Sequence, residues 1–294
     1  MVVFGAGALG SFIGGMLSRK HDVLLIGRRD HVHAIKKNGL KISGKTNFIA
    51  YPDATVTMKE GNEIDIVILA VKAYDTEKAV KKIANICSAP ILSLQNGIKN
   101  EEIVMEISGE KRAIGGITTH GVRYISPGEV CHTGVGETII GEMDGSISER
   151  IKKFANMLSE CRIETKISED IRKEIWRKAI VNAAINPLTA ILRCKNGYLL
   201  ETTHTKKLME DICKEATMVS KSAGIDVGND VIKKVKEVAY LTRENHSSML
   251  QSAIRNKRTE IDYINGEIAR IGKKNGIETP INSTLVAIIK AMEK

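Results

Sequence analysis

Residues 1–19 contain the feature that most constrains the fold. Residues 1–4 form a short apolar run that leads directly into a glycine-rich turn, and residues 11–19 have a pattern typical of a helix. The turn reads GxGxxG and consists of Gly5, Ala6, Gly7, Ala8, Leu9 and Gly10. In such a turn the first glycine permits the bend, the second lets the backbone approach a pyrophosphate, and the third lets helix and strand pack closely. The following helix offers backbone N–H groups to a phosphate. The segment therefore predicts dinucleotide binding in preference to an ordinary glycine turn.

Arginines at the end of the second strand indicate which dinucleotide is bound. The predicted strand over 22–26 leads into Gly27, Arg28, Arg29 and Asp30. An NAD-specific site usually places a carboxylate here for the ribose 2′-hydroxyl. A guanidinium can instead pair with a 2′-phosphate, which favours NADP, with Arg28 as the first candidate and Arg29 as the second. Asp30 keeps NAD as a second choice, and as N-cap of a helix over 31–37 it has an equally good structural role.

Two further strands end in polar residues. Residues 64–71 are continuously aliphatic, as is the run over 90–94, and such runs are typical of parallel strands buried on both faces. They lead into Lys72 and Asn96. Because ligands of doubly wound sheets bind beyond the carboxyl ends of the strands, we expect both residues at the cofactor crevice. The alternatives are a lysine that ends its strand in water and an asparagine that serves the turn before Gly97.

The rest of the chain changes character at residue 168. Segments 113–124 and 131–142 are predicted strands whose turn at 126–128 closes the sheet with an antiparallel hairpin. A helix over 148–161 and a strand over 162–167 follow. After that, only helical periodicity remains, near 170–193, 205–222, 229–242, 245–255, 257–275 and 282–293. The predicted fold is α/β: a Rossmann-type dinucleotide-binding domain over 1–168, followed by an all-α C-terminal domain over 169–294.

The helix predicted within 176–200 carries a stripe of polar side chains. Lys178, Asn182 and Asn186 interrupt an otherwise small and aliphatic sequence. Each step of four residues turns the side chain about 40° beyond a full turn, so the three lie on one face. Facing packed hydrocarbon would cost several kcal/mol for each unpartnered group, so we expect the stripe to line a cavity. The alternative is a solvated lysine with asparagines that bind neighbouring backbone.

Composition excludes several classes of protein. With 43% apolar and 27% charged residues over 294 positions, the chain is typical of a globular protein. It has no apolar run of about 18 residues for a membrane span and no room for a signal peptide before the first strand. We therefore expect a cytoplasmic protein. The odd number of cysteines fits reduced thiols; they are Cys87, Cys131, Cys161, Cys194 and Cys213.

Charge and histidine placement exclude two kinds of site. The net charge of +9 is spread over dispersed lysines, and aromatic residues make up only 4% of the chain, which argues against a nucleic-acid partner. Attraction of a polyanionic small molecule, or solubility alone, explains the charge as well. The chain has no CxxC motif, and His31 and His33 have no further metal-binding residue types nearby, so we expect no metal.

Eight sequence blocks resemble those of one enzyme family in order and spacing. They are GAGALG at 5–10, VKAYD at 71–75, LQNG at 94–97, GGITTHG at 115–121, WRKAIVNAAINPLTAI at 176–191, NG at 196–197, SSMLQ at 247–251 and TEIDYINGEI at 259–268. With these blocks the chain resembles the ketopantoate reductase (2-dehydropantoate 2-reductase) family over essentially its whole length.

The resemblance implies NADPH-dependent reduction of ketopantoate to (R)-pantoate on the route to pantothenate and coenzyme A. It implies that Lys178 is the general acid and that Glu260 is the carboxylate near the lysine and the cofactor. The implied substrate contacts are Lys178, Asn182, Asn186, Asn196 and Ser248. The implied cofactor contacts are Gly5 to Gly10, Arg28, Lys72, Asn96, the backbone at Val122 and Glu260.

Two other functions are compatible with parts of this pattern. The first is a related NAD(P)-dependent reductase of another 2-oxo acid, because related reductases share the scaffold. The second is a non-catalytic NADPH-binding sensor or nucleic-acid partner, suggested by the glycine turn and the basic charge alone. A homodimer is also compatible with the apolar helix faces.

Overall fold

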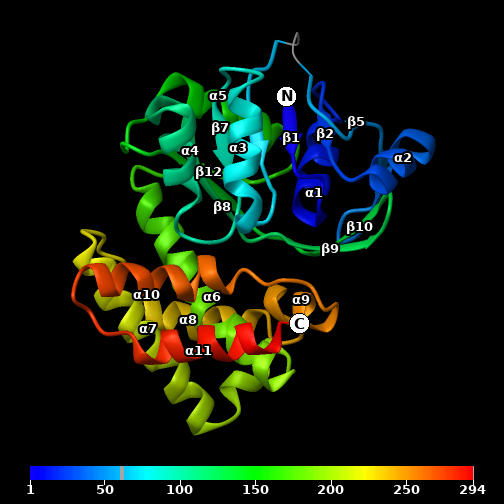
Figure 1. Cartoon of the computed structure of the whole chain (residues 1–294). Helices are drawn as coiled ribbons and strands as arrows, with labels where there is room; N and C mark the ends of the chain where they lie inside the picture. Colours follow the sequence, from blue (N-terminus) through cyan, green and yellow to red (C-terminus); the bar gives the residue numbers. More distant parts are fainter. Residues whose placement is uncertain (60–62, 294) are drawn as a thin grey trace. The chain divides into compact units, whose positions relative to one another are not determined.

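A computed structural model describes residues 1–59 and 63–293. The chain divides into two compact units. The first consists of Met1–Gln95 and Asn100–Ile171, and the second of Asn96–Lys99 and Arg172–Lys294. The described strands all belong to the first unit, whereas the second is helical (Figure 1). In the described ranges no helix has both the length and the apolar character needed to cross a membrane.

The first unit is built on an eight-stranded sheet with the order β12-β11-β8-β7-β6-β1-β2-β5. Its strands are β1 (Val2–Phe4), β2 (Leu24–Ile26), β5 (Asp53–Thr55), β6 (Val67–Leu69), β7 (Ile91–Ser93), β8 (Ala113–Thr118), β11 (Thr138–Glu142) and β12 (Thr165–Ile167). The strands from β5 to β8 are parallel, and β11 is antiparallel to β8. Every residue of β6 and β7 is buried, which explains their continuously aliphatic sequence.

Helices cover both faces of this sheet. They are α1 (Ala8–Leu17), α2 (Arg29–Asn38), α3 (Thr76–Ala84), α4 (Asn100–Ser108) and α5 (Glu149–Glu160). Along β6, Ile68 packs in one core with α1 and α5, whereas its neighbours Val67 and Leu69 pack in another with α3 and α4. This alternation is the two-residue period of a strand between two helical layers. The predicted doubly wound sheet is confirmed. Helix α4 lies where we predicted no element.

The predicted hairpin lies in a different sheet. Residues 113–142 form four strands, because β9 (Gly121–Ser126) and β10 (Glu129–Gly134) separate β8 from β11. The hairpin β9–β10 belongs to a four-stranded sheet with β3 (Leu40–Gly44) and β4 (Phe48–Ala50), and so does not close the main sheet. No residue of β9 is buried, whereas every residue of β8 is buried, so the two strands suit different environments. The prediction of one hairpin that closes the main sheet was wrong.

The second unit is helical throughout its described residues. Its helices are α6 (Ile171–Leu192), α7 (Thr203–Ser222), α8 (Val231–Leu241), α9 (Ser248–Ile254), α10 (Asn265–Lys274) and α11 (Pro280–Met292), with the 3-10 turns η3 (Asn196–Leu200) and η4 (Ile261–Tyr263). The predicted helix over 257–275 is shorter than expected, because only α10 is α-helical there. Asn256 has φ of +50°, a left-handed conformation that ends α9 and directs the chain into an irregular segment before η4.

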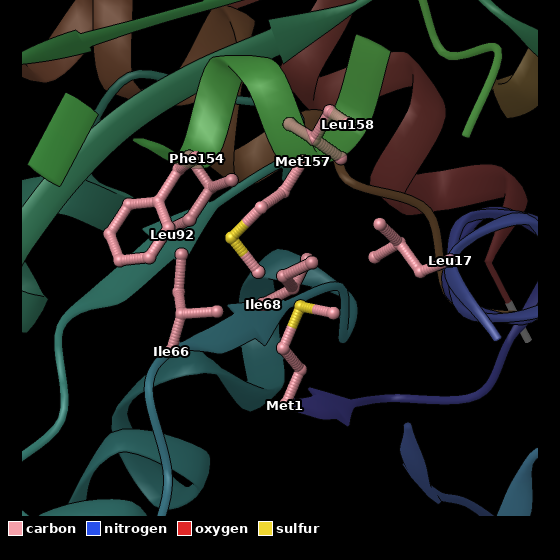
Figure 2. A pocket seen from close by; sticks show the side chains of 8 residues that line it. All are labelled: Met1, Leu17, Ile66, Ile68, Leu92, Phe154, Met157 and Leu158. Atoms are coloured by element: carbon pink, nitrogen blue, oxygen red, sulfur yellow. The ribbon is translucent and has the colours of Figure 1, made fainter. Parts of the chain in front are cut away.

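A small cavity lies in the core of the first unit. It has a volume of about 10 Å³ and is lined by Met1, Leu17, Ile66, Ile68, Leu92, Phe154, Met157 and Leu158 (Figure 2). These side chains are all apolar, and the space is no larger than a water molecule requires. The cavity is therefore a packing defect and not a ligand site.

Candidate functional site

The glycine turn between β1 and α1 has the backbone geometry that the sequence predicted. Gly5 has φ of +110°, and a Cβ there would lie 2.6 Å from the backbone nitrogen of Val71. A Cβ on Gly10 would lie 2.2 Å from the carbonyl oxygen of Gly5. In contrast, a Cβ on Gly7 would meet no atom within 4 Å. The first and third glycines are thus required for packing, whereas the second borders open space.

The open space at Gly7 fits a phosphate. Gly7 is the N-cap of α1, and no side chain caps this helix or places a carboxylate in its first turn. Backbone N–H groups at a helix start attract anions because they carry the positive end of the helix dipole. A cradle that is open at Gly7 and closed at Gly5 and Gly10 therefore suits the pyrophosphate of a dinucleotide.

Arg28 lies next to this turn. The chain leaves β2 through Gly27, whose added Cβ would lie 2.9 Å from Cβ of Ala6, so the loop packs against the glycine turn. Arg28 is exposed and is the N-cap residue of α2. The prediction that Asp30 caps this helix was wrong, because α2 begins at Arg29 and Asp30 lies in its first turn. A carboxylate there is still favoured by the helix dipole.

A buried histidine fixes the start of α2, a role that its sequence context does not indicate. His31 is 2% exposed. Its Nε2 lies 2.9 Å from Oγ of Ser11 in α1, and the backbone N–H of Gly128 donates to its Nδ1 at 2.9 Å. Because Nδ1 accepts from a backbone N–H, the neutral ring carries its proton on Nε2. Burial lowers the pKa of His31, which favours this neutral form.

A buried amide network holds the segments that follow β6 and β7. Gln95 donates from Nε2 to the carbonyl of Val71 at 2.9 Å and to Oγ1 of Thr76 at 2.8 Å. Thr76 in turn donates to Oδ1 of Asn100 at 2.9 Å. The half-buried Lys72 lies between Val71 and Thr76, the two residues that Gln95 holds. Sequence reasoning missed this network, because the amide and hydroxyl partners are 19 and 24 residues apart.

Val122 lies in β9, opposite His132 of β10. Two histidines are bonded beside it: Nδ1 of His120 lies 3.1 Å from Nε2 of His132, whose Nδ1 lies 2.8 Å from Oγ1 of Thr46. Burial and the neighbouring His132 lower the pKa of His120 to about 4. Burial also lowers the pKa of His132. The half-buried His120 and the buried His132 are therefore neutral near pH 7 and support β9.

In the second unit, α6 carries the predicted polar stripe. Lys178 and Asn182 are half-buried, and Asn186 is 5% exposed. The helix contains Pro187, which has no N–H for the carbonyl of Ala183, four residues earlier. The small and aliphatic residues of α6 pack against other helices in the core of the second unit, and the polar stripe occupies one face of the same helix.

A contact between two hydroxyl groups links this helix to the start of α9. Oγ1 of Thr189, one turn after Asn186, lies within hydrogen-bond distance of Oγ of Ser247, at 2.7 Å. Ser247 is buried and caps α9 by accepting from the N–H of Leu250, so Ser248 begins a helix anchored beside Asn186. The sequence gives no sign of this contact between Ser247 and Thr189 of α6, because the two residues are 58 positions apart.

Asn196 is held in the same region. Its backbone N–H donates to the carbonyl of Asn245 at 3.0 Å, and its Nδ2 donates to Oγ1 of Thr242 at 2.9 Å. Its Oδ1 is buried without a hydrogen-bond partner among the described residues. Since a buried acceptor without a partner costs free energy, this oxygen is suited to a donor from a ligand.

Asn96 and Glu260 both belong to the second unit. Glu260 is 6% exposed and precedes η4. The N–H of Ile98 donates to the carbonyl of Tyr263, the last residue of η4, at 3.3 Å. Gly97 has φ of +107°, and its added Cβ would lie 2.7 Å from that same oxygen, so only glycine allows this approach. The segment that carries Asn96 therefore packs with the helical unit.

The described residues contain no group of three side chains suited to hold a metal ion. What the first unit offers is a phosphate cradle with an adjacent arginine. What the second unit offers is a lysine and two amides on α6, together with the anchored Asn196 and the buried carboxylate of Glu260. A Rossmann-type unit followed by such a helical unit is the arrangement of a two-domain dinucleotide-dependent oxidoreductase.

Comparison with known proteins specifies the family. Residues 1–145 match the model of the family "Ketopantoate reductase PanE/ApbA", and residues 170–293 match that of its C-terminal domain. The chain belongs to the ketopantoate reductase family. The 2-dehydropantoate 2-reductase of Pyrococcus abyssi is 41% identical over 293 residues, which are 99% of this chain and 97% of the relative. The enzyme of the same name from Archaeoglobus fulgidus is 38% identical over 292 residues, again 99% and 97% of the two chains.

Solved structures have the same fold. A ketopantoate reductase of this family from Ralstonia eutropha aligns with a TM-score of 0.91 at 30% identity, over 100% of this chain and 98% of the other. A D-mandelate dehydrogenase in ternary complex with NADH and anilino(oxo)acetate aligns with a TM-score of 0.93 at 30% identity, over the same shares. The neighbour with bound NADH indicates a nicotinamide dinucleotide as the cofactor of this fold.

Proposed function

We propose that this chain reduces 2-dehydropantoate (ketopantoate) to (R)-pantoate with NADPH, a step of pantothenate and coenzyme A biosynthesis. The observation that carries the proposal is the set of polar side chains in the helical unit: a lysine and two amides on α6, the start of α9 linked to α6 through Ser247 and Thr189, and Asn196 held by Thr242. Relatives that match over nearly their full length have this activity in their names. We assign residues 1–168 to coenzyme binding and 169–294 to substrate binding and catalysis.

When bound, the coenzyme would supply a hydride to the ketone carbon. We assign its pyrophosphate to the cradle at Gly7 and its 2′-phosphate to Arg28, since a guanidinium forms short, charge-assisted bonds with phosphate. Lys72, Asn96 and the backbone at Val122 are the remaining proposed contacts. The exposed position of Arg28 beside the glycine turn supports NADPH over NADH.

Lys178 is the proposed general acid. Negative charge develops on the ketone oxygen during reduction, and an ammonium within hydrogen-bond reach stabilises this charge and then gives up its proton. Glu260, which is buried, would favour the charged lysine, because a nearby carboxylate opposes the effect of burial on an ammonium. In this way two charged groups of one unit activate the carbonyl.

The amides and a serine orient the substrate. Asn182, Asn186 and Ser248 offer donors for its carboxylate, and the unpartnered Oδ1 of Asn196 offers an acceptor for its hydroxyl. Holding both ends fixes which face of the ketone is exposed, and thus the hand of the product. Because all five cysteines are free thiols, we also propose that the enzyme works in a reducing compartment such as the cytoplasm.

The test is a coenzyme-oxidation assay with purified protein, run separately with saturating NADPH and saturating NADH. We expect ketopantoate-dependent oxidation that is faster with NADPH. The likeness to a D-mandelate dehydrogenase bound to an anilino(oxo)acetate makes another 2-oxo acid the second candidate substrate. A panel of branched and aromatic 2-oxo acids distinguishes the two, since a higher kcat/KM for one of these than for ketopantoate would overturn the assignment.

A further inference from the structure

The proline in α6 removes a backbone hydrogen bond at the C-terminal end of the polar stripe. Pro187 has no N–H, so the carbonyl of Ala183 loses the donor that an unbroken α-helix would supply. Ala183 and Pro187 are both buried, so water cannot replace that donor. The turn that lacks this bond begins directly after Asn182 and contains Asn186, two members of the stripe.

A side chain from another helix replaces the missing donor. Nδ2 of Asn265, the first residue of α10, donates to the carbonyl of Ala183 at 3.1 Å. Asn265 is 0% exposed. The buried amide of Asn265 therefore donates to the carbonyl that Pro187 leaves without a partner, in the place of a backbone N–H.

A buried chain of polar groups fixes the direction of this amide. The carboxylate of Glu215 in α7 accepts from the N–H and Nδ2 of Asn282, at 2.9 and 2.7 Å. Since a carboxylate only accepts, the amide nitrogen of Asn282 faces Glu215 and its Oδ1 faces Asn265, which donates to it at 3.0 Å. The second proton of the Asn265 amide is then left for the carbonyl of Ala183.

The other side of the proline is also held by side chains. The carbonyl of Asn186 accepts from Oγ1 of Thr189 at 3.0 Å, and Oγ of Ser247 lies 3.5 Å from it. Proline normally kinks a helix because its ring pushes the earlier carbonyl aside. The bond from Asn265 on one side and these hydroxyls on the other therefore determine how Asn186 is directed relative to Asn182 and Lys178.

We propose that Asn265 is a positioning residue for the active-site helix: it supplies the hydrogen bond that Pro187 removes and so aligns the two halves of the polar stripe. This inference rests on the proposed function of the stripe. The chain Glu215–Asn282–Asn265 acts through α6 and need not touch the substrate.

The test is a double-mutant cycle between Asn265→Leu and Pro187→Ala. Leucine has nearly the shape of asparagine but no donor, and the Pro187→Ala substitution restores the N–H for Ala183. We expect Asn265→Leu to lower kcat/KM for ketopantoate at least about tenfold, with KM for NADPH within about twofold of wild type. In the Pro187→Ala background the loss caused by Asn265→Leu shrinks to about threefold or less, because the carbonyl again has a backbone donor.

A matched control is Asn275→Leu at the end of the same helix. Asn275 is exposed and donates to Oγ of Ser222 at 3.1 Å, so this variant removes one asparagine bond away from α6. We expect it to leave kcat/KM within about twofold of wild type and to show no coupling to Pro187→Ala. Asn265→Ser, which keeps a hydroxyl donor, provides a folded variant with a smaller loss if leucine prevents folding.

Thermal unfolding of the same variants needs no substrate. It therefore tests the role of Asn265 separately from the proposed reduction of ketopantoate. We expect Asn265→Leu to lower the unfolding midpoint less in the Pro187→Ala background than in the wild-type background. Equal effects in both backgrounds, in unfolding and in kcat/KM, would overturn the inference while the proposed function stands. A wild-type protein that does not reduce ketopantoate would overturn the proposed function, whereas coupling in the unfolding midpoint would still assign the hydrogen bond.

Discussion

Gly128 donates its backbone N–H to Nδ1 of His31 at 2.9 Å, and this bond joins the first turn of α2 to the β9–β10 hairpin. The same ring contacts Ser11 of α1 through Nε2 at 2.9 Å. The residue that we assign to the 2′-phosphate, Arg28, lies three positions before His31. One imidazole thus connects the arginine's helix to the helix that follows the glycine turn.

The first prediction concerns this histidine. His31→Ala leaves the N–H of Gly128 buried without an acceptor, which typically costs about 1–3 kcal/mol. Because the start of α2 then loses its anchor, we expect KM for NADPH to rise about three- to tenfold, with a smaller change in kcat. His33→Ala on the same helix is the matched control, because His33 is exposed. Steady-state kinetics at varied NADPH check the result, and equal KM values in the two variants would contradict it.

The second prediction concerns the choice of coenzyme. A charge-assisted hydrogen bond contributes about 1.5–3 kcal/mol, so Arg28→Ala should raise KM for NADPH at least about tenfold and leave KM for NADH nearly unchanged. Arg29→Ala should have the weaker effect, since Arg29 is the second candidate. The measurement is KM for both coenzymes in the three proteins. An equal rise in KM for NADH would show that Arg28 does not bind the 2′-phosphate.

The third prediction separates two glycines of one turn. Gly7→Ala should fold normally, because its Cβ meets no atom within 4 Å, and yet lower NADPH affinity at least about tenfold by filling the phosphate cradle. Gly10→Ala places a Cβ 2.2 Å from the carbonyl oxygen of Gly5 and should lower the unfolding temperature by several degrees. Coenzyme titration and thermal unfolding of both variants check the contrast. Similar unfolding temperatures would disprove it.

The fourth prediction concerns stability at acid pH. Burial, and then the neighbouring His132, lower the pKa of His120 from 6.5 to about 4 in the folded protein. Between these two values the unfolded chain binds more protons than the folded one, so this group's contribution to stability falls as the pH falls from 6.5 towards about 4. His120→Gln should therefore reduce the loss of urea midpoint between pH 7.5 and pH 4.5. His204→Gln, at an exposed histidine, should not change that loss. If the urea midpoint falls equally in the two variants between these pH values, His120 does not contribute to the loss of stability at acid pH.

The sequence predicted the parts of the fold that depend on local pattern. Aliphatic runs identified β6 and β7, and the spacing of three glycines identified the turn before α1. The polar stripe of α6 was visible because four-residue spacing places side chains on one face. These features require only the residues of one segment.

Features that depend on distant partners were missed. Strand β3 pairs with β10, almost 90 residues later, and no local pattern indicates that pairing. His31 is bonded to a residue 97 positions away, and Asn265 to one 82 positions away. A histidine or asparagine looks the same in sequence whether it is solvated or serves as a buried donor. Its role therefore follows only from tertiary contacts.

The fifth prediction concerns the proposed general acid. General acid catalysis typically contributes about 10²- to 10⁴-fold, so Lys178→Ala should lower kcat for ketopantoate at least about 10²-fold with an unchanged unfolding temperature. Lys178→Arg keeps a charge but cannot give up a proton near neutral pH, so it should recover substrate binding more than turnover. Lys173→Ala, on the same helix but about 140° around it, is the control and should keep near-normal turnover.

The most direct test of the account is NADPH oxidation that depends on ketopantoate, measured side by side for the wild-type protein and Lys178→Ala. The account predicts robust turnover by the wild type and a loss of at least about 10²-fold in the variant, with (R)-pantoate as the product. Near-normal turnover in Lys178→Ala, or no reduction of ketopantoate by the wild type, would contradict it.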